Sequence, residues 1–140
     1  MNEPDVIARM LGNPKVKPVT IAVVGLSANE AKPSHYVPAY MQEQGYRILP
    51  VNPTVETVLG ERSYGSLREL PVKPDVVNVF RLPKDIPEIV DEMLDLGLTK
   101  LWVQMGIVNL GEAARAEAGG IEVVMDRCMM VEHRHHASLS

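Results

Sequence analysis

VTIAVVGLSANEAKP, residues 19–33, is the stretch that decides the fold of this chain. Its first half is an apolar, β-branched run that closes on Gly25, and its second half is a polar loop, residues 25–33, named here the Gly25 loop. An apolar run of this kind is typical of a strand buried on both faces. We therefore predict a strand that feeds a helix through the Gly25 loop, an arrangement that presents backbone N–H groups to a phosphate.

The same alternation continues along the rest of the chain, where short β-branched runs are separated by longer segments with helical spacing. Because these runs are almost continuously apolar, they favour a parallel sheet. The sequence thus predicts the α/β class, with a Rossmann-like doubly wound sheet of about five parallel strands and helices on both faces. The predicted strands are residues 19–25, 46–51, 74–80, 100–105 and 121–125.

Helix start and stop signals lie between the predicted strands. The predicted helices are residues 3–12, 34–45, 85–96 and an alanine-rich run between the Asn109–Glu112 capping box and Gly119. Pro38 is tolerated only in the first turn of a helix, so the second helix should begin close to Ser34. Residues 54–71 should cross over with at most a short helix near residues 66–70. We expect one domain over residues 1–140, with an N-terminal helix and linker in residues 1–18 and a frayed tail in residues 134–140.

Composition excludes several classes of protein. The net charge is −4, from 14 lysines and arginines against 18 acids, and no dense basic run marks a nucleic-acid surface. No apolar run approaches the roughly 18 to 20 residues that a bilayer requires. The single cysteine, Cys128, excludes an intrachain disulfide. Because residues 1–18 also lack the features of a secretory signal, we expect a cytoplasmic protein that does not enter a membrane.

The ligand site of such a sheet lies at the carboxyl ends of the strands. The Gly25 loop departs from the G-x-G-x-x-G fingerprint, since Ser27 and Glu30 occupy the second and third glycine positions. Ser27, Asn29 and Lys32 could still donate hydrogen bonds to a pyrophosphate, and the alternative is an ordinary polar loop.

The second strand ends in V-N-P, where a nicotinamide dinucleotide site usually has an acidic residue for the ribose hydroxyls. Asn52 and Pro53 supply no carboxylate, which argues against NAD and would spare a phosphorylated ribose from repulsion. Arg81 could give a phosphate two parallel donors, with Lys84 nearby. The alternative is that both cations only solvate a helix start.

Several longer motifs occur in order from Val19 to His133. They are VVGLSxNxxKPSxxV, LPVNP, PDVVNVFR, LWxQxGI and VMDRCMxxEH. In these motifs the chain resembles the bacterial and archaeal CoA-binding domain proteins, which are small stand-alone relatives of the N-terminal CoA-binding domain of the succinyl-CoA synthetase alpha subunit. The resemblance implies a Rossmann-like domain that binds coenzyme A, with the nucleotide over the carboxyl ends of the strands. The cofactor-binding residues that it implies are Gly25, Ser27, Ala28, Lys32 and Pro33 in the Gly25 loop, Asn52 and Pro53 on the adenosine side, Phe80 and Arg81 after the third strand, and Gln104 and Gly106 after the fourth.

The chain departs from the synthetase subunit in ways that bear on activity. That subunit has an acidic residue before Gly-Ile where this chain has Met105, and its phosphorylated histidine belongs to a second domain that these residues do not match. We therefore predict a module that binds coenzyme A or acyl-CoA without self-contained catalysis, working with a protein partner or as a homo-oligomer. The alternatives are an NAD(P)-binding redox domain and a subunit of an acyl-CoA ligase or acyltransferase that needs partner domains.

Three residues with reactive side chains, Cys128, His133 and His35, could take part in chemistry. Cys128 and His133 do not have zinc-site spacing, so no metal site is predicted. Cys128 could exchange thiols with coenzyme A, although a small buried hydrophobic residue is the alternative. His35 could act as a base near a thioester, but it has no identifiable partner, so we predict no catalytic residue.

Overall fold

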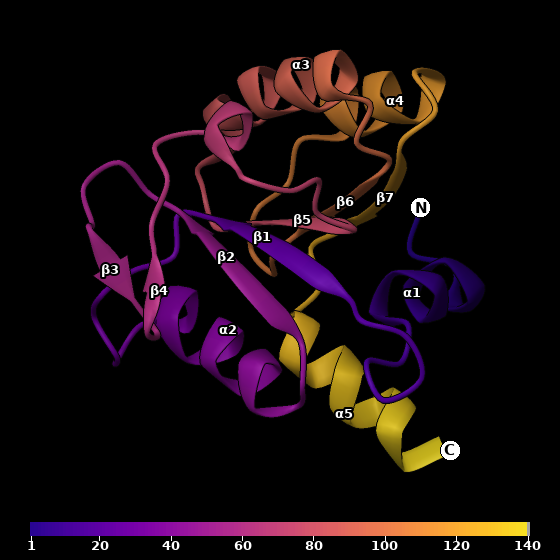
Figure 1. Ribbon diagram of the computed structural model, residues 1–140. Helices are drawn as coiled ribbons and strands as arrows, with labels where there is room; N and C mark the ends of the chain where they lie inside the picture. The colour runs from indigo at the N-terminus through magenta and orange to yellow at the C-terminus, as the bar shows by residue number, and fades with distance from the viewer. Residues whose placement is uncertain (140) are drawn as a thin grey trace.

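The structure, a computed structural model, describes residues 1–139 and contains a five-stranded parallel sheet in the order β2-β1-β5-β6-β7 (Figure 1). The predicted α/β doubly wound fold is confirmed, and all five predicted strands are present with slightly shorter bounds. The sheet strands are β1 (Thr20–Val24), β2 (Arg47–Val51), β5 (Val76–Val79), β6 (Lys100–Val103) and β7 (Glu122–Met125).

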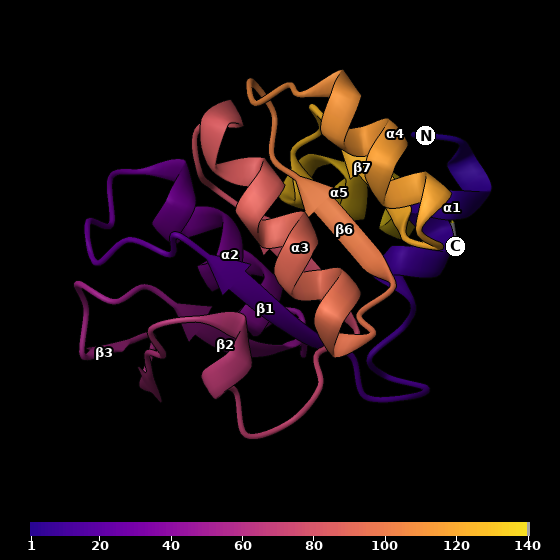
Figure 2. The same cartoon turned by 90° about the horizontal axis from the view of Figure 1, so that it is seen from above.

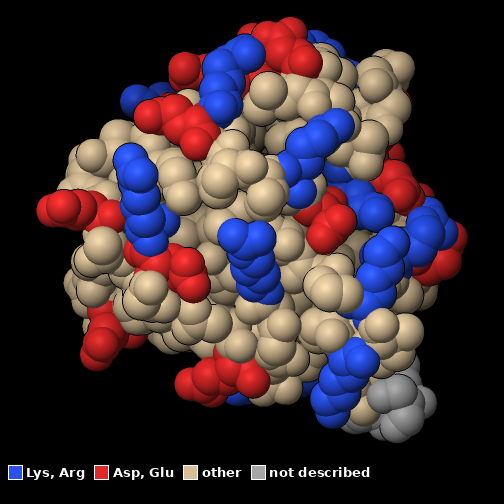
Figure 3. Space-filling view, viewed as in Figure 1, with Lys and Arg blue, Asp and Glu red and all other residues tan. Residues whose placement is uncertain are grey.

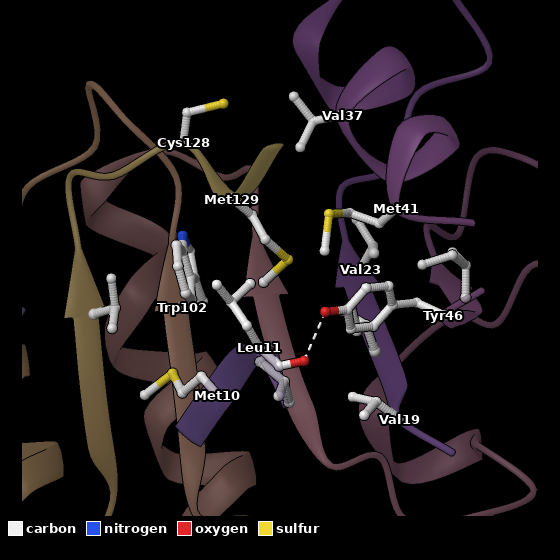
Figure 4. Packing of buried hydrophobic residues seen from close by; sticks show 14 of the residues in the cluster. Met10, Leu11, Val19, Val23, Val37, Met41, Tyr46, Trp102, Cys128 and Met129 are labelled. Carbon is white, nitrogen blue, oxygen red and sulfur yellow. Dashed lines mark hydrogen bonds between the residues drawn. The ribbon is translucent and has the colours of Figure 1, made fainter. Parts of the chain in front are cut away.

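Helices cover both faces of the sheet (Figure 2). One face carries α1 (Pro4–Leu11), α2 (Pro33–Glu43) and α5 (Met129–Leu139), and the other carries α3 (Ile86–Leu96) and α4 (Leu110–Ala118). Each face has its own apolar core, because side chains of successive strand residues point to opposite sides. In the core on the α2 side, the Tyr46 hydroxyl donates to the Leu11 carbonyl at 2.6 Å, beside fully buried Trp102 (Figure 4).

Pro38 was expected in the first turn of its helix, and that expectation is wrong. Helix α2 begins at Pro33, so Pro38 lies inside the helix. The missing proline N–H would leave the Ser34 carbonyl without its helical donor. That carbonyl instead accepts a hydrogen bond from the Ser27 amide, with N and O 3.1 Å apart. The Gly25 loop thus satisfies the group that Pro38 leaves unpaired.

The crossover from β2 to β5 contains more structure than predicted. A two-stranded hairpin of β3 (Thr57–Val58) and β4 (Glu61–Arg62) precedes η1 (Leu67–Glu69), a single 3-10 turn where a short helix was predicted. The hairpin turns at Leu59 and Gly60, with φ of 55° and 74°. Turns of this kind usually have Asn-Gly or Asp-Gly at these positions. The Leu-Gly pair therefore did not indicate a hairpin. A second 3-10 turn, η2 (Pro83–Asp85), leads into α3.

The frayed tail expected over residues 134–140 is a second error as far as Leu139, where α5 ends, and residue 140 lies outside the described residues. Its packing on α2 explains the order. His133 Nδ1 lies 2.8 Å from the Tyr40 hydroxyl, and the Arg134 guanidinium lies 5.0 Å from the centre of the Tyr40 ring. At the opposite terminus, the predicted helix is confirmed as α1. Among the described residues, no helix has the length and apolar character needed to cross a membrane.

Candidate functional site

The loops after β1, β2, β5 and β6 meet at the carboxyl edge of the sheet, as predicted. The chain order of the strands reverses between β1 and β5, which is where ligands bind in open α/β sheets. Gly25 lies at this point with φ of +90°, and a Cβ there would stand 2.6 Å from the Phe80 carbonyl oxygen. Glycine is therefore required for both conformation and space, and the close approach joins the β1 and β5 ends.

Hydrogen bonds within the Gly25 loop hold it in one shape. The Asn29 amide donates to Ser27 Oγ, and the Ala31 amide donates to Asn29 Oδ1, each at 3.0 Å. The Ser27 hydroxyl and the Asn29 side-chain amide act here as acceptors, which leaves their hydrogens available to a ligand. Within residues 1–139, the amides of Ala28 and Glu30 have no protein acceptor. The sequence did not predict a role for the Glu30 amide, because the types of side chain in a loop do not show which backbone N–H groups stay unpaired.

The N-terminus of α2 adds favourable electrostatics for an anion. Lys32 is the exposed N-cap residue of this eleven-residue helix, and the first turn contains no acidic residue. Unpaired N–H groups give a helix N-terminus a partial positive charge, and Lys32 adds a full one. Lys and Arg alternate with Asp and Glu over the face shown in Figure 3. On this face an anion would thus depend on local groups such as Lys32, because no broad basic surface is present there.

Asn52 connects the loops after β1 and β2. Its Nδ2 donates to the Leu26 carbonyl at 2.9 Å, while its Oδ1 accepts from the Thr54 amide at 3.0 Å and from the Thr54 hydroxyl at 2.8 Å. Asn52 therefore organises the edge. Its neighbour Pro53 lines a cavity, so of the two predicted adenosine-side residues Pro53 is the one that faces open space.

This cavity has a volume of about 210 Å³ and lies between the β2 and β5 ends and the start of α3. Its polar walls come from Ser66, Arg81 and the carboxylates Asp85, Glu88 and Glu92, and Arg81 Nε lies 3.4 Å from Asp85 Oδ2. Apolar walls with a few polar groups suit a flat aromatic base. The lining residues are Val24, Val51, Pro53, Gly65, Ser66, Leu67, Arg81, Asp85, Glu88, Ile89 and Glu92.

Hydrogen bonds to Met129 and Asp126 hold the two predicted residues at the end of β6. Gln104, 4% exposed, accepts a hydrogen bond from the Met129 amide at the start of α5, with N and Oε1 3.4 Å apart. Gly106 donates its amide to Asp126 Oδ1 at 2.7 Å. Asp126 has φ of 62°, a conformation that Asp tolerates better than most residues. Both predicted residues thus belong to this edge, but Asp126, which positions Gly106, was missed.

The reactive residues separate in space. His35 lies at the edge, with Nδ1 2.7 Å from the Ser27 carbonyl oxygen. Cys128 is 7% exposed and directly precedes α5, close to Met129 and the apolar core (Figure 4). His133 lies further along α5, and its pKa is lowered because the ring is partly buried and because His136 is near. Thiol exchange at Cys128 stays a prediction.

Two other hollows suit an anionic ligand less well. One of about 430 Å³ is lined by four carboxylate residues, Glu3, Asp5, Glu117 and Glu122, which would repel phosphates. Another of about 250 Å³, bordered by Tyr46, lies where α1, α2 and α5 end. Helix C-termini carry partial negative charge, which counteracts the positive charge of Lys15 in the lining of this hollow.

Comparison with known proteins agrees with this geometry. The CoA binding domain family matches residues 19–134. The chain belongs to the CoA-binding domain family. The uncharacterized protein YneT of Bacillus subtilis strain 168 is 41% identical to it over 113 residues, which cover 81% of this chain and 84% of YneT. The structure of cell-free ID.343 from Thermus thermophilus superposes with a TM-score of 0.86 at 37% identity, covering 95% of this chain and 98% of that one. The family resemblance inferred from the motifs is confirmed.

A larger enzyme shares part of this domain. Acetate–CoA ligase [ADP-forming] II of Archaeoglobus fulgidus is 28% identical over 83 residues, or 58% of this chain. The match covers 12% of the ligase. The CoA-binding domain described here is thus similar to a small part of an enzyme whose remaining length has no counterpart in the matched residues.

Proposed function

We propose that this CoA-binding domain protein binds coenzyme A or its acyl thioesters at the carboxyl edge and leaves any chemistry to a protein partner. The observation that carries the proposal is the structure of the Gly25 loop. Its unpaired Ala28 and Glu30 amides adjoin Lys32 at a helix start that has no acidic residue in its first turn. These groups suit a pyrophosphate. Membership of the CoA-binding domain family supports the same ligand.

The neighbouring cavity would receive the adenosine. Its volume of about 210 Å³ and its apolar walls at Val51, Pro53 and Ile89 suit a purine ring. Carboxylates of α3 also line the cavity, and they would accept hydrogen bonds from amino or hydroxyl groups but repel a phosphate. The ribose phosphate of coenzyme A would therefore lie outside the cavity, on the side of Lys32 and the solvent-facing loops.

The end of β2 favours coenzyme A over NAD. Asn52 replaces the usual acidic residue, and its side-chain amide is engaged with Leu26 and Thr54. No carboxylate at this strand end would hold the hydroxyls of an unphosphorylated ribose. The alternative role as a ligase subunit is favoured by the match to the acetate–CoA ligase, and it requires the same ligand at the same edge.

Calorimetric titration with coenzyme A, dephospho-CoA and NAD tests this proposal. We expect the affinity to fall in that order, because dephospho-CoA lacks the ribose phosphate and NAD also lacks the pantetheine arm. Tighter binding of NAD than of coenzyme A would support the redox alternative instead. Co-purification of a nucleotide-binding partner would favour the ligase-subunit role over a stand-alone module.

Thiol exchange at Cys128 is a separate part of the proposal. In this step the Cys128 thiolate attacks one sulfur of oxidised CoA disulfide, forms a protein–CoA disulfide and releases one CoA thiolate. Burial of Cys128 requires that its surroundings open for the reaction. Mass spectrometry after incubation with CoA disulfide would show the adduct on Cys128. An unmodified cysteine, under conditions in which an exposed thiol exchanges, would leave only the structural role.

A further inference from the structure

Pro38 occupies an unusual place in α2. It is the sixth residue of the helix, where proline lacks the N–H that would donate to the carbonyl four residues earlier. That carbonyl belongs to Ser34. The proline ring also crowds the same carbonyl. Pro38 is buried, and a proline at this position weakens the helix. Any stabilising effect of Pro38 therefore acts on groups outside the helix.

The Ser34 carbonyl has a partner in the Gly25 loop. The Ser27 amide donates to it at 3.1 Å. The carbonyl of the same residue, Ser27, lies 2.7 Å from Nδ1 of His35. Because a carbonyl oxygen only accepts hydrogen bonds, Nδ1 must carry the proton. The first turn of α2 therefore holds both backbone polar groups of one loop residue, the residue directly before Ala28.

We propose that Pro38 is a positioning residue for the ligand loop. By withholding its own N–H, Pro38 leaves the Ser34 carbonyl to Ser27 and so fixes the path of the chain into Ala28 and Glu30. The amides of these two residues then keep one arrangement before a ligand arrives. Loops that are ordered in advance bind more tightly, since less conformational freedom is lost on binding. The ligand part of this inference rests on the proposed coenzyme A binding, whereas the loop part does not.

The substitution Pro38→Ala tests the inference in the intact chain. The alanine N–H would compete with the Ser27 amide for the Ser34 carbonyl. We expect amide hydrogen exchange at Ser27 to become about three- to tenfold faster, which is the factor that one net hydrogen bond contributes. The dissociation constant for coenzyme A should rise by a similar factor. The melting temperature should stay the same or rise, because α2 gains a hydrogen bond.

Pro87→Ala is the matched control. Pro87 lies in the first turn of α3, where no helical hydrogen bond is lost to proline, so neither Ser27 exchange nor coenzyme A affinity should change. Unchanged Ser27 exchange in the Pro38→Ala protein would overturn the inference. The Pro38→Ala protein could show faster Ser27 exchange while even the wild type does not bind coenzyme A. That result would support the positioning of the loop by Pro38 and overturn the proposed function.

A second variant tests the hold of α2 on the loop at the other backbone group of Ser27, independently of Pro38. His35→Phe keeps a ring at the helix start but removes the donor to the Ser27 carbonyl. Faster exchange in residues 27–30, with the melting temperature kept, would support the hold of α2 on the loop. Exchange at the wild-type rate in this variant would overturn it.

Discussion

The two ends of α2 show how one helix serves a ligand edge and a structural edge. At its beginning, Lys32 and the Gly25 loop present a cation and unpaired amides to solvent. At its other end, the chain enters β2 through Tyr46, which is 3% exposed and hydrogen bonded to the Leu11 carbonyl. Burial raises the pKa of Tyr46 to about 12, which keeps it neutral. Backbone amides thus stay unpaired in the loop at the carboxyl edge, whereas the Tyr46 hydroxyl and the Leu11 carbonyl at the amino edge are satisfied within the protein.

Gly25→Ala should have the largest effect, because it acts at the carboxyl edge on both stability and binding. The added Cβ would meet the Phe80 carbonyl oxygen at 2.6 Å, and φ of +90° is unfavourable for alanine. We expect a loss of about 2–4 kcal/mol in the free energy of unfolding, measured in urea, and loss of coenzyme A binding.

Gly60→Ala separates the cost of backbone strain from the cost of a steric clash. Gly60 also has positive φ, at +74°, but a Cβ there meets nothing within 4 Å. A loss of only about 1 kcal/mol is expected, since conformational strain acts alone. Equal losses for the two variants would show that the contact with Phe80 is unimportant.

Lys32→Ala should weaken coenzyme A binding without affecting stability. Loss of one cation beside a pyrophosphate should raise the dissociation constant about five- to tenfold at low salt, and by less at high salt. Calorimetry at two salt concentrations measures both effects. Lys15→Ala, at the opposite end of the sheet beside Tyr46, is the control and should leave the affinity unchanged. A comparable loss in both variants would mean that only net charge matters.

Tyr46→Phe should lower stability and leave coenzyme A binding unchanged, which is the opposite of the effect expected for Lys32→Ala. Loss of the hydroxyl leaves the Leu11 carbonyl unpaired, and the free energy of unfolding should fall by about 1 kcal/mol. Coenzyme A affinity should stay at the wild-type value, because the amino edge is not part of the proposed site. A binding defect with wild-type stability would contradict the division between the two ends of α2.

The pH dependence contributed by His133 should be the smallest effect. Its pKa is lowered in the folded protein, mainly by burial, so the unfolded chain binds more protons near its ordinary pKa of about 6.5. Stability should therefore rise with pH and decline as the pH falls below that value. Urea unfolding between pH 5 and 7.5 should show a steeper decline for the wild type than for His133→Gln. Parallel curves would mean that other groups cause the dependence.

The sequence predicted those parts of the fold that depend on local pattern. Continuous apolar runs identified all five sheet strands, and parallel strands bring their carboxyl ends together, which located Gly25, Asn52, Arg81 and Gln104 at one edge. The rest depended on contacts between distant segments. Interaction with Tyr40 orders α5 where a tail was expected, and Asp126 reaches the Gly106 amide across neighbouring strand ends. The position of Pro38 within α2 was predicted wrongly. Helix propensity accounts for the helical hydrogen bond that a proline removes, but not for the hydrogen bond from Ser27 that takes its place.

The most direct test of coenzyme A binding at the carboxyl edge is an amide NMR titration of the protein with coenzyme A. We predict that the resonances of Ala28 and Glu30 shift most, together with residues around Pro53 and Arg81 at the cavity. Amides near Lys15 and Tyr46, at the other end of the sheet, should remain in place. Shifts concentrated at the Lys15 end, or none at Ala28 and Glu30 when coenzyme A is saturating, would contradict the claim that the carboxyl edge binds the cofactor.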